Sequence, residues 1–511
     1  MRYLKVIIAS LIAILSLNAC EDFLTDDPES VLGQTDFFIT PVRINQGVLG
    51  CYAGMKPIMT DEWMLTELRS DNTCVYALGS SSSRRTELTN IAHFALLPSE
   101  VAIQNYWYNT FQNISNINAV LPSVVDNSFV TIEDDRAQYE SELRFMRAYH
   151  YFTLVNLFGD MFKVTSVIGP EDAKSIMRSP VTEVYDDIII PDLLIAAENA
   201  PDAYTGDDVG RITKWAAKGL LAKAYVQQGG SANLALAKSL LEEIFNEGPH
   251  DLASNFADIF DPTKEMSAEV RLEVLFSVRY RGGNTSNGSQ FWEFFAPQNS
   301  DLLAAGSPDG DNNPTFEFMS LFDGDTLDTR AAASFDLYYR SSTRFASYTT
   351  KYIDNNIKIK ESAENDWIVL RYADLKLLYA EILAQDGGFA EAHIHLNDVR
   401  RRAGKPEAAP FTSANMALDS VYHERRLELA FENHRWFDLL RMNTSYNDPN
   451  KAMDILKLHT FTTDWALVYS LFDPLPVPDE GNYVNEHLLL PIPQYELDAN
   501  NEVVIQQNPG Y

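Results

Sequence analysis

Cysteine, positive charge and long apolar runs are all scarce in this sequence. Its three cysteines are too few for a fold built on disulfides. Forty Lys and Arg against 72 Asp and Glu give a net charge of −32, which repels nucleic-acid phosphates and anionic lipid headgroups. Beyond the N-terminus no apolar run is long enough to predict a transmembrane helix. The hydrophobic fraction of 46% is that of a globular protein, so we expect a large core and no binding to nucleic acid.

The N-terminus has the pattern of a bacterial lipoprotein signal. Arg2 and Lys5 precede the apolar run 6–17, and the string Leu-Asn-Ala-Cys then ends at Cys20. This string resembles a lipobox, in which Cys20 carries the lipid after cleavage; the alternative is an ordinary signal peptide. The expected organisation is a signal peptide over 1–19, a lipidated acidic tether over 20–35 and one domain over 36–511.

Acidic residues follow Cys20 closely, between positions 21 and 29. This stretch resembles the export signal that sends some Gram-negative lipoproteins to the cell surface, and a plain solvated tether is the alternative. The other two cysteines, Cys51 and Cys74, either pair in an oxidising compartment or remain free thiols.

Apolar residues recur at helical spacing, which predicts a mainly α-helical fold. Two helices are expected to end at glycines, 139–158 at Gly159 and 215–228 at Gly229. A third, 370–385, and a fourth, 389–402, are separated by a short glycine turn.

The third and fourth segments predict a helical hairpin that resembles a tetratricopeptide unit. Small residues at Ala380 and Ala392 would let its two helices approach closely. A long amphipathic helix is expected over 418–441. Long irregular insertions are expected between the helical hairpins, over 60–135, 160–212, 247–369 and 442–511.

Common metal and hydrolase motifs fail on inspection. His423 and Glu424 begin like a zinc-protease helix, but Leu427 replaces the second histidine ligand. A calcium-loop pattern starts at Asp309, Asp311 and Asn313 but lacks the required glycine and the final glutamate. We therefore expect no cofactor, with bound Ca²⁺ as the one alternative, and no catalytic residues.

Several ordered strings resemble one family, the SusD/RagB family of surface nutrient-binding lipoproteins. They are ELRFMRAY at 142–149, RYAD at 371–374, LNDVR at 396–400, ERRLELAFE at 424–432, HRWFDL at 434–439 and QNPGY at 507–511. The resemblance covers essentially the whole chain after the signal. It departs only at 500–505, where the family's usual Asn-Pro is missing.

Membership of this family implies a helical fold with tetratricopeptide-like units beneath a loop-rich binding face. It also implies anchoring at the outer membrane, facing the exterior, and a partner, a SusC-like TonB-dependent transporter. The expected function is non-catalytic binding of an oligosaccharide or polysaccharide and its delivery to that transporter. Alternatives are a peptide-binding lid of a RagAB-type importer, a surface glycoside hydrolase, and a scaffold that binds only proteins.

Two loops have the residue types that recognise a neutral sugar, which offers hydroxyls and flat C–H faces. The first loop supplies Asp71, Tyr76 and Arg84 as ligand-binding candidates. Trp107, on the helix that follows, is assigned to the core.

The second loop runs from Arg279 to Phe295 and adds four more candidates, Tyr280, Arg281, Asn284 and Trp292. Tyr280 and Trp292 are expected to be exposed for stacking, whereas the three phenylalanines beside Trp292 favour core packing. Arg84 and its neighbour Arg85, with Arg279 and Arg281, keep the peptide alternative open, because guanidinium groups hold carboxylates.

The charged helix around 424–438 is interpreted as structural rather than catalytic. Its acids Glu424, Glu428 and Glu432 recur every four residues beside several arginines, a spacing that permits ion pairs. Arg371 and Asp374 are expected to join the same network.

Overall fold

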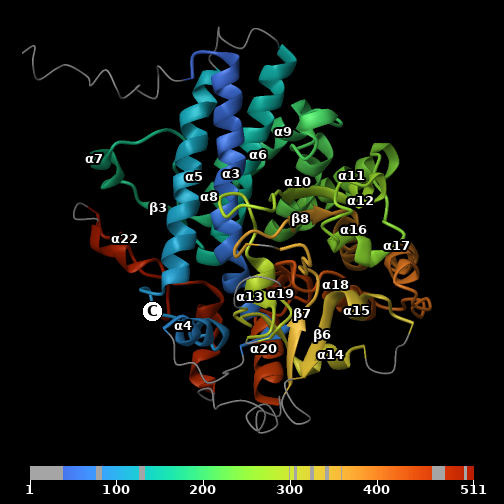
Figure 1. Ribbon diagram of the computed structural model, residues 1–511. Helices are drawn as coiled ribbons and strands as arrows, with labels where there is room; N and C mark the ends of the chain where they lie inside the picture. Colours follow the sequence, from blue (N-terminus) through green and yellow to red (C-terminus); the bar gives the residue numbers. More distant parts are fainter. Residues whose placement is uncertain are drawn as a thin grey trace, which may run out of the picture.

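The computed structural model describes residues 38–75, 83–125, 133–298, 300–303, 308–322, 327–339, 345–357, 359–462, 478–499 and 503–511. Helices predominate, as expected (Figure 1). The predicted signal peptide, Cys20, the tether and Tyr76 lie outside these ranges. Inside them, none of the helices combines the length and the apolar character needed to cross a membrane.

Three long helices stand side by side at one end of the molecule, α3 (Pro41–Thr66), α5 (Val101–Val125) and α6 (Glu133–Phe158) (Figure 1). Thr40 caps α3 by accepting a hydrogen bond from the backbone N–H of Arg43. The α3 and α5 backbones approach so closely that a Cβ at Gly54 would lie 2.6 Å from Asn113 Cγ. The α6 helix ends as predicted at Gly159, which has φ +74°. The α5 helix is the helix expected around Trp107, and it fills much of the segment 60–135 that we otherwise expected to be irregular.

Two helical hairpins continue the layer, α10 (Lys214–Gln228) with α11 (Ser231–Glu247) and α16 (Tyr372–Asp386) with α17 (Phe389–Arg402). The predicted small residues Ala380 and Ala392 are completely buried between α16 and α17. One boundary is wrong, because residues 370 and 371 belong to a strand and α16 begins only at residue 372.

The single helix expected over 418–441 is also wrong. It is two helices, α18 (Ala414–Glu428) and α19 (Arg435–Ser445). Between them Phe431 and Asn433 have positive φ angles of 67° and 63°. The backbone of this turn is held from outside, since Tyr352 donates to the Phe431 carbonyl at 2.8 Å and Glu67 accepts from the Asn433 N–H at 2.8 Å.

The described residues form four small antiparallel sheets, and two of them join segments far apart in the sequence. They are β1 (Thr73–Cys74) with β5 (Asn313–Pro314), β2 (Met161–Phe162) with β3 (Arg178–Ser179), β4 (Val274–Val278) with β8 (Trp367–Arg371), and β6 (Phe335–Tyr339) with β7 (Phe345–Thr349). In the third sheet Val278 lies opposite Trp367, which brings the segment after β4 beside the segment before β8.

Short elements complete the fold. They are η1 (Glu67–Arg69), α4 (Ser83–Ala92), α7 (Pro170–Ala173), α8 (Val181–Val184), η2 (Tyr185–Ile189), α9 (Ile190–Asn199), η3 (Gly206–Asp208), η4 (Phe256–Phe260), α12 (Ala268–Glu273), α13 (Phe291–Phe295), α14 (Phe316–Ser320), α15 (Arg330–Ser334), α20 (Lys451–Thr462), η5 (Glu480–Asn482), η6 (Asn485–Leu488) and α22 (Gln494–Ala499).

One large hydrophobic core joins these layers, and much of the aromatic content lies in it. Trp107 is buried there, as expected, and so are Tyr149 and Trp436. Cys51 and Cys74 are not joined to each other, so the disulfide considered above does not form. Burial raises the pKa of the Cys51 thiol to about 12.

The charged signature residues form a buried network, which confirms their structural interpretation. Arg371 is fully buried and bonds Glu428 at 2.6 Å, Glu432 at 2.7 Å and Glu273 at 2.8 Å. Arg330 bonds both Glu424 and Glu428, at 2.6 and 3.1 Å. These pairs join different segments of the chain rather than successive turns of one helix.

Candidate binding cleft

The structure uses Asp71 internally. Its carboxylate is 2% exposed and accepts hydrogen bonds from Arg435 at 2.7 and 2.8 Å. Burial alone would raise the pKa of Asp71, but Arg426 and Arg435 hold it well below its usual range. The carboxylate that we expected to meet a ligand therefore anchors α19 to the segment after η1.

Arg84 is partly exposed but also has partners. It bonds Asp311 at 2.8 Å and lies over the Phe294 ring at 4.9 Å from the centroid. Arg85 bonds the same Asp311 at 3.3 Å, so a carboxylate of the calcium-like pattern serves two guanidinium groups. Across the described part of the chain, no cluster of three or more His, Cys, Asp or Glu residues is placed to hold a metal ion.

The exposure expected for the two stacking rings is wrong. Tyr280 is 7% exposed, packs edge-on against Phe291, and donates from its hydroxyl to the Lys56 carbonyl at 3.1 Å. Trp292 is 2% exposed and packs with Tyr348. All five residues of α13 are buried, because this short helix inserts between the sheets instead of lying on them.

Arg281 and Asn284 are exposed, on a tight turn that follows Tyr280. The turn is closed by a hydrogen bond from the Arg281 N–H to the Asn287 carbonyl at 2.8 Å, and Gly283 in it has φ +92°. Lys56 of α3 reaches the Asn287 side chain at 3.4 Å. The ligand-binding role of these two residues stays a prediction. Their turn contacts Lys56, which lines the cleft described next.

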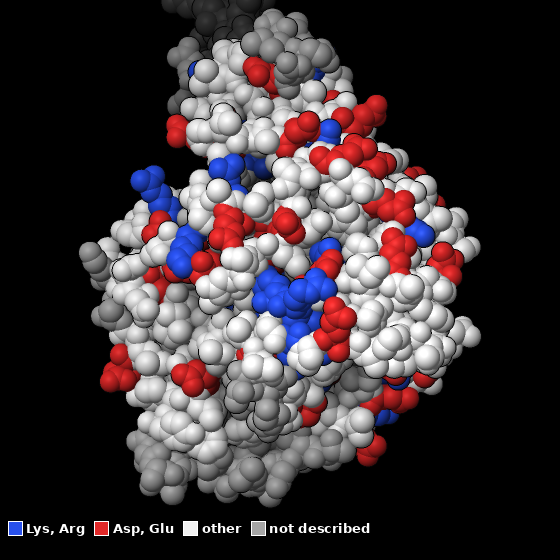
Figure 2. Space-filling view, turned by 90° about the vertical axis from the view of Figure 1, so that its right-hand side faces the viewer, with Lys and Arg blue, Asp and Glu red and all other residues white. Residues whose placement is uncertain are grey.

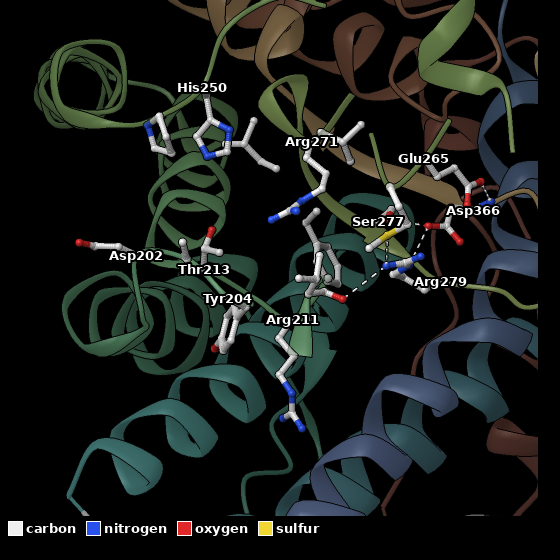
Figure 3. Close-up of a pocket in the computed structure, with 18 residues that line it drawn as sticks. Asp202, Tyr204, Arg211, Thr213, His250, Glu265, Arg271, Ser277, Arg279 and Asp366 are labelled. Carbon is white, nitrogen blue, oxygen red and sulfur yellow. Dashed lines mark hydrogen bonds and ion pairs between the residues drawn. The ribbon is translucent and has the colours of Figure 1, made fainter. Parts of the chain in front are cut away.

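Two adjoining hollows form a cleft between α3, the loop 202–213 and the β4 strand. Their volumes are about 140 and 230 Å³, and Gly210, Arg211 and Arg279 line both. Figure 3 shows the first hollow, with Tyr204 and Thr213 on one side and Ser277, Arg279 and Asp366 on the other.

Arg279 forms the wall shared by the two hollows. Its Nε donates to Asp366 at 3.1 Å and its Nη1 to the Val209 carbonyl at 3.4 Å. The loop passes so close that a Cβ at Gly210, where φ is +103°, would lie 2.6 Å from Arg279 Cδ. Glycine at this position therefore lets the loop pack against the arginine.

Two acids lie behind Arg279. Asp366 accepts from Arg279, from Ser277 at 3.2 Å and from the Tyr280 N–H at 2.8 Å. Glu265 accepts from the Asp366 N–H at 2.9 Å. Burial, followed by the neighbouring Asp366 carboxylate, raises the pKa of Glu265, which favours the neutral form of this side chain.

Polar groups without a protein partner also face the cleft. Arg271, at the end of α12, is exposed and reaches toward the middle of the hollow in Figure 3. Its backbone N–H donates to the Ser267 carbonyl at 3.1 Å, but its guanidinium has no hydrogen bond or ion pair with any residue that the structure describes. His250 shares a hydrogen bond between its Nδ1 and the Leu272 carbonyl at 2.9 Å, while its buried Nε2 has no partner. Burial lowers the pKa of His250, which keeps the ring neutral and makes Nε2 an acceptor.

Arg211, by contrast, is fully engaged. It extends away from the hollow in Figure 3 and bonds Glu142 at 3.0 Å, Asp208 at 2.7 Å and Asn45 at 2.7 Å. Figure 2 shows one face of the molecule with many acidic side chains and a small group of Lys and Arg near its centre.

Most of the cleft could not be found from the sequence. Its residues come from five separate segments, 49–56, 202–213, 249–250, 265–279 and residue 366, and none of the five forms a recognisable motif. The one local signal was the polar string that begins at Arg279, which opens the loop that we considered for sugar recognition and whose arginines kept the peptide alternative open.

Two family models match the chain. The model of the SusD family matches residues 219–511, and a model described as "Starch-binding associating with outer membrane" matches residues 22–226. SusD-like protein P25 of Formosa agariphila is 26% identical over 537 aligned positions, which cover 97% of this chain and 96% of the relative.

Solved structures share the fold over almost the whole chain. A laminarin-binding SusD-like protein has a TM-score of 0.72 at 23% identity and covers 92% of this chain and 99% of its own. Surface glycan-binding protein A of Bacteroides thetaiotaomicron, in complex with laminarihexaose, has a TM-score of 0.73 at 20% identity, with the same coverage. At these identities the likeness establishes the fold alone.

Proposed function

The chain belongs to the SusD family, whose model matches more than half of its length, and on this premise we propose that it is a surface glycan-binding lipoprotein. In this proposal it captures an oligosaccharide outside the cell and delivers it to a SusC-like TonB-dependent transporter in the outer membrane. The transporter supplies the energy for import, and this chain supplies recognition.

The set of partnerless hydrogen-bonding groups in one cleft carries this proposal. A sugar presents many hydroxyls, each able to donate and accept. Arg271 offers donors and His250 Nε2 offers an acceptor, and neither is used by the described protein. The half-buried ring of Tyr204 beside them provides a flat surface for the C–H face of a sugar.

Support for the surface location and for the ligand class comes from relatives. One matching family model is described as associating with the outer membrane, and two solved structures of the same fold are named for binding laminarin or for a complex with laminarihexaose. The lipobox-like string at Cys20 fits the same location.

We further propose that binding is not followed by catalysis. The hydrolase alternative rests on one observation, the neighbouring carboxyl groups of Glu265 and Asp366 in the cleft. Both Asp366 oxygens are occupied by hydrogen bonds, so this carboxylate is held as a partner of Arg279 rather than left free to attack. Release of product from a labelled glycan, abolished by Glu265→Gln, would overturn the proposal.

Calorimetric titration of the purified chain tests binding directly. The panel contains laminari-, malto- and uronic acid oligosaccharides together with short peptides. We expect heat with at least one glycan, and a loss of affinity of about 3- to 10-fold in His250→Ala, the magnitude of one hydrogen bond. His423→Ala, at an exposed histidine on α18, is the matched control and should bind like the native chain.

Heat with peptides alone would replace the glycan by a peptide ligand. Delivery is tested in the native host, where deletion of the gene should abolish uptake of the bound glycan. Restoration by the native chain but not by Cys20→Ala supports a lipid-anchored partner of the transporter, and equal restoration by both variants contradicts it.

A further inference from the structure

We propose that the sugar bound in this cleft carries a carboxylate, as a uronic acid does, and that Arg271 is its principal contact. This inference rests on the proposed function and names the class of its ligand. It also makes Arg271 a specificity-determining residue.

Arg271 is unusual for its surroundings because its guanidinium has no acidic partner among the described residues. The chain has 72 acidic residues for 40 Lys and Arg, so an arginine normally finds a carboxylate. Arg211 and Arg279 in the same cleft each bond an acid, whereas Arg271 bonds none among the residues in the described ranges. Its guanidinium nevertheless extends into the hollow, as Figure 3 shows.

The other charged side chains that line the hollow already have partners. Arg279 and Asp366 compensate each other at 3.1 Å, Arg211 pairs with Glu142 and Asp208, and Asp202 pairs with Lys214 at 2.5 Å. Burial and the neighbouring Asp366 carboxylate raise the pKa of the half-buried Glu265, which favours its uncharged form. The guanidinium of Arg271 is thus left for the ligand to pair with.

A second free site distinguishes a sugar from a simple anion. His250 Nε2 is a buried acceptor without a partner and lines the same hollow. A ligand that satisfies both groups needs an anionic acceptor for the guanidinium and a donor such as a hydroxyl for the imidazole. A uronic acid carries both on one ring.

The inference is tested by titrating the chain with oligogalacturonate, oligoguluronate and oligoglucuronate, each beside its methyl ester. Esterification removes the charge and leaves the ring intact. We expect at least one acid to bind about tenfold more tightly than its ester, the strength of one charge-assisted hydrogen bond. Arg271→Gln should abolish this preference, and raising NaCl from 50 to 500 mM should reduce it.

Arg401→Gln provides the matched control, because Arg401 is a 62% exposed arginine on α17 that does not line the cleft. It should keep the preference for the acid, and both variants should melt within about 1 °C of the native chain. If an acid and its ester bind equally, and Arg271→Gln leaves that affinity unchanged, the inference is overturned while the proposed glycan function stands.

Two further results separate the two proposals. If no glycan binds, charged or neutral, the proposed function fails and the inference fails with it. If acidic peptides bind through Arg271 and uronic acids do not, the carboxylate contact is right but the sugar class is wrong, and the inference is overturned.

Discussion

Arg371→Met should destabilise the folded chain strongly without touching the cleft. The guanidinium is completely buried and donates to three glutamates, Glu273, Glu428 and Glu432, at 2.6 to 2.8 Å. It also donates to the Glu428 carbonyl at 2.7 Å. Methionine has a similar length but no charge, so the change leaves the three carboxylates with excess negative charge inside the protein.

The magnitude follows from the cost of removing one partner of a buried ion pair, about 3–5 kcal/mol. Unfolding entropy is about 2 cal/mol/K per residue, or roughly 1 kcal/mol/K for a chain of this length, so the melting temperature should fall by about 3–5 °C. In the variant Glu273 still pairs with Arg402 and Glu432 still pairs with Lys351, which limits the loss of stability.

The pH dependence of this deficit adds a second test. Burial alone would raise the pKa of Glu432, but Arg371 and Lys351 hold it below its usual range, so the pairing stabilises the native chain above about pH 4.5 and is lost as pH falls further. Without Arg371 the buried carboxylates take up protons at higher pH, which removes their unpaired charge. The deficit of Arg371→Met should therefore be largest at pH 7 and shrink toward pH 5.

Thermal unfolding followed by circular dichroism at pH 5 and pH 7 measures both effects. Arg401→Met, at an exposed arginine paired with Asp398 and Glu407, should change the melting temperature by less than about 1 °C. A melting temperature of Arg371→Met within 1 °C of the native value at both pH values would refute the reasoning. It would mean that the network contributes nothing to stability.

Four other substitutions test packing and burial. Gly54→Ala should destabilise the chain by about 1–3 kcal/mol, because its Cβ would lie 2.6 Å from Asn113 Cγ, whereas Gly50→Ala in the same helix has open space and should stabilise it by about 0.5–1 kcal/mol in urea unfolding. Burial raises the pKa of Glu62 to about 7, so the stability it provides falls as pH rises from 4.5 to 7. Glu62→Gln should be more stable than the native chain by up to about 3 kcal/mol at pH 8. A stability difference at pH 8 that is no larger than the difference at pH 5 would contradict this. Trp292→Ala should lower stability by about 3–5 kcal/mol yet leave glycan affinity in the cleft unchanged. If the variant still folds but loses glycan affinity, Trp292 is a ligand-binding residue after all.

The helices that the sequence predicts well are those whose ends are determined locally. Helix 215–228 ends at Gly229 because a left-handed residue there stops it, with φ +74°, and α17 has the predicted bounds of 389 and 402. The helix expected over 418–441 fails because its break depends on distant partners. Lys351 and Arg371 both donate to the Glu428 carbonyl, and no local pattern shows these contacts.

The same distinction applies to the candidate site. Aromatic and polar residues next to each other in a loop predicted a stacking surface, but adjacent residues of a buried helix point in several directions and all of α13 is covered by other segments. Arg281 and Asn284 are exposed because a turn that contains glycines lies at the surface whatever the rest of the fold does. Their role in ligand binding stays a prediction. The cleft itself depends on pairing between β4 and β8, which are almost ninety residues apart in the sequence.

The distribution of arginine explains why the Arg271 guanidinium matters in so acidic a protein. Arg330, Arg371, Arg425 and Arg441 are all buried with carboxylate partners, so the fold uses these cations internally. The chain as a whole has a net charge of −32, and this negative charge repels an anionic ligand at long range. At physiological salt that repulsion is screened beyond about 8 Å, so the decision falls to the charges inside the cleft. There the guanidinium of Arg271 pairs with no carboxylate of the described residues, and a negatively charged ligand supplies the missing partner.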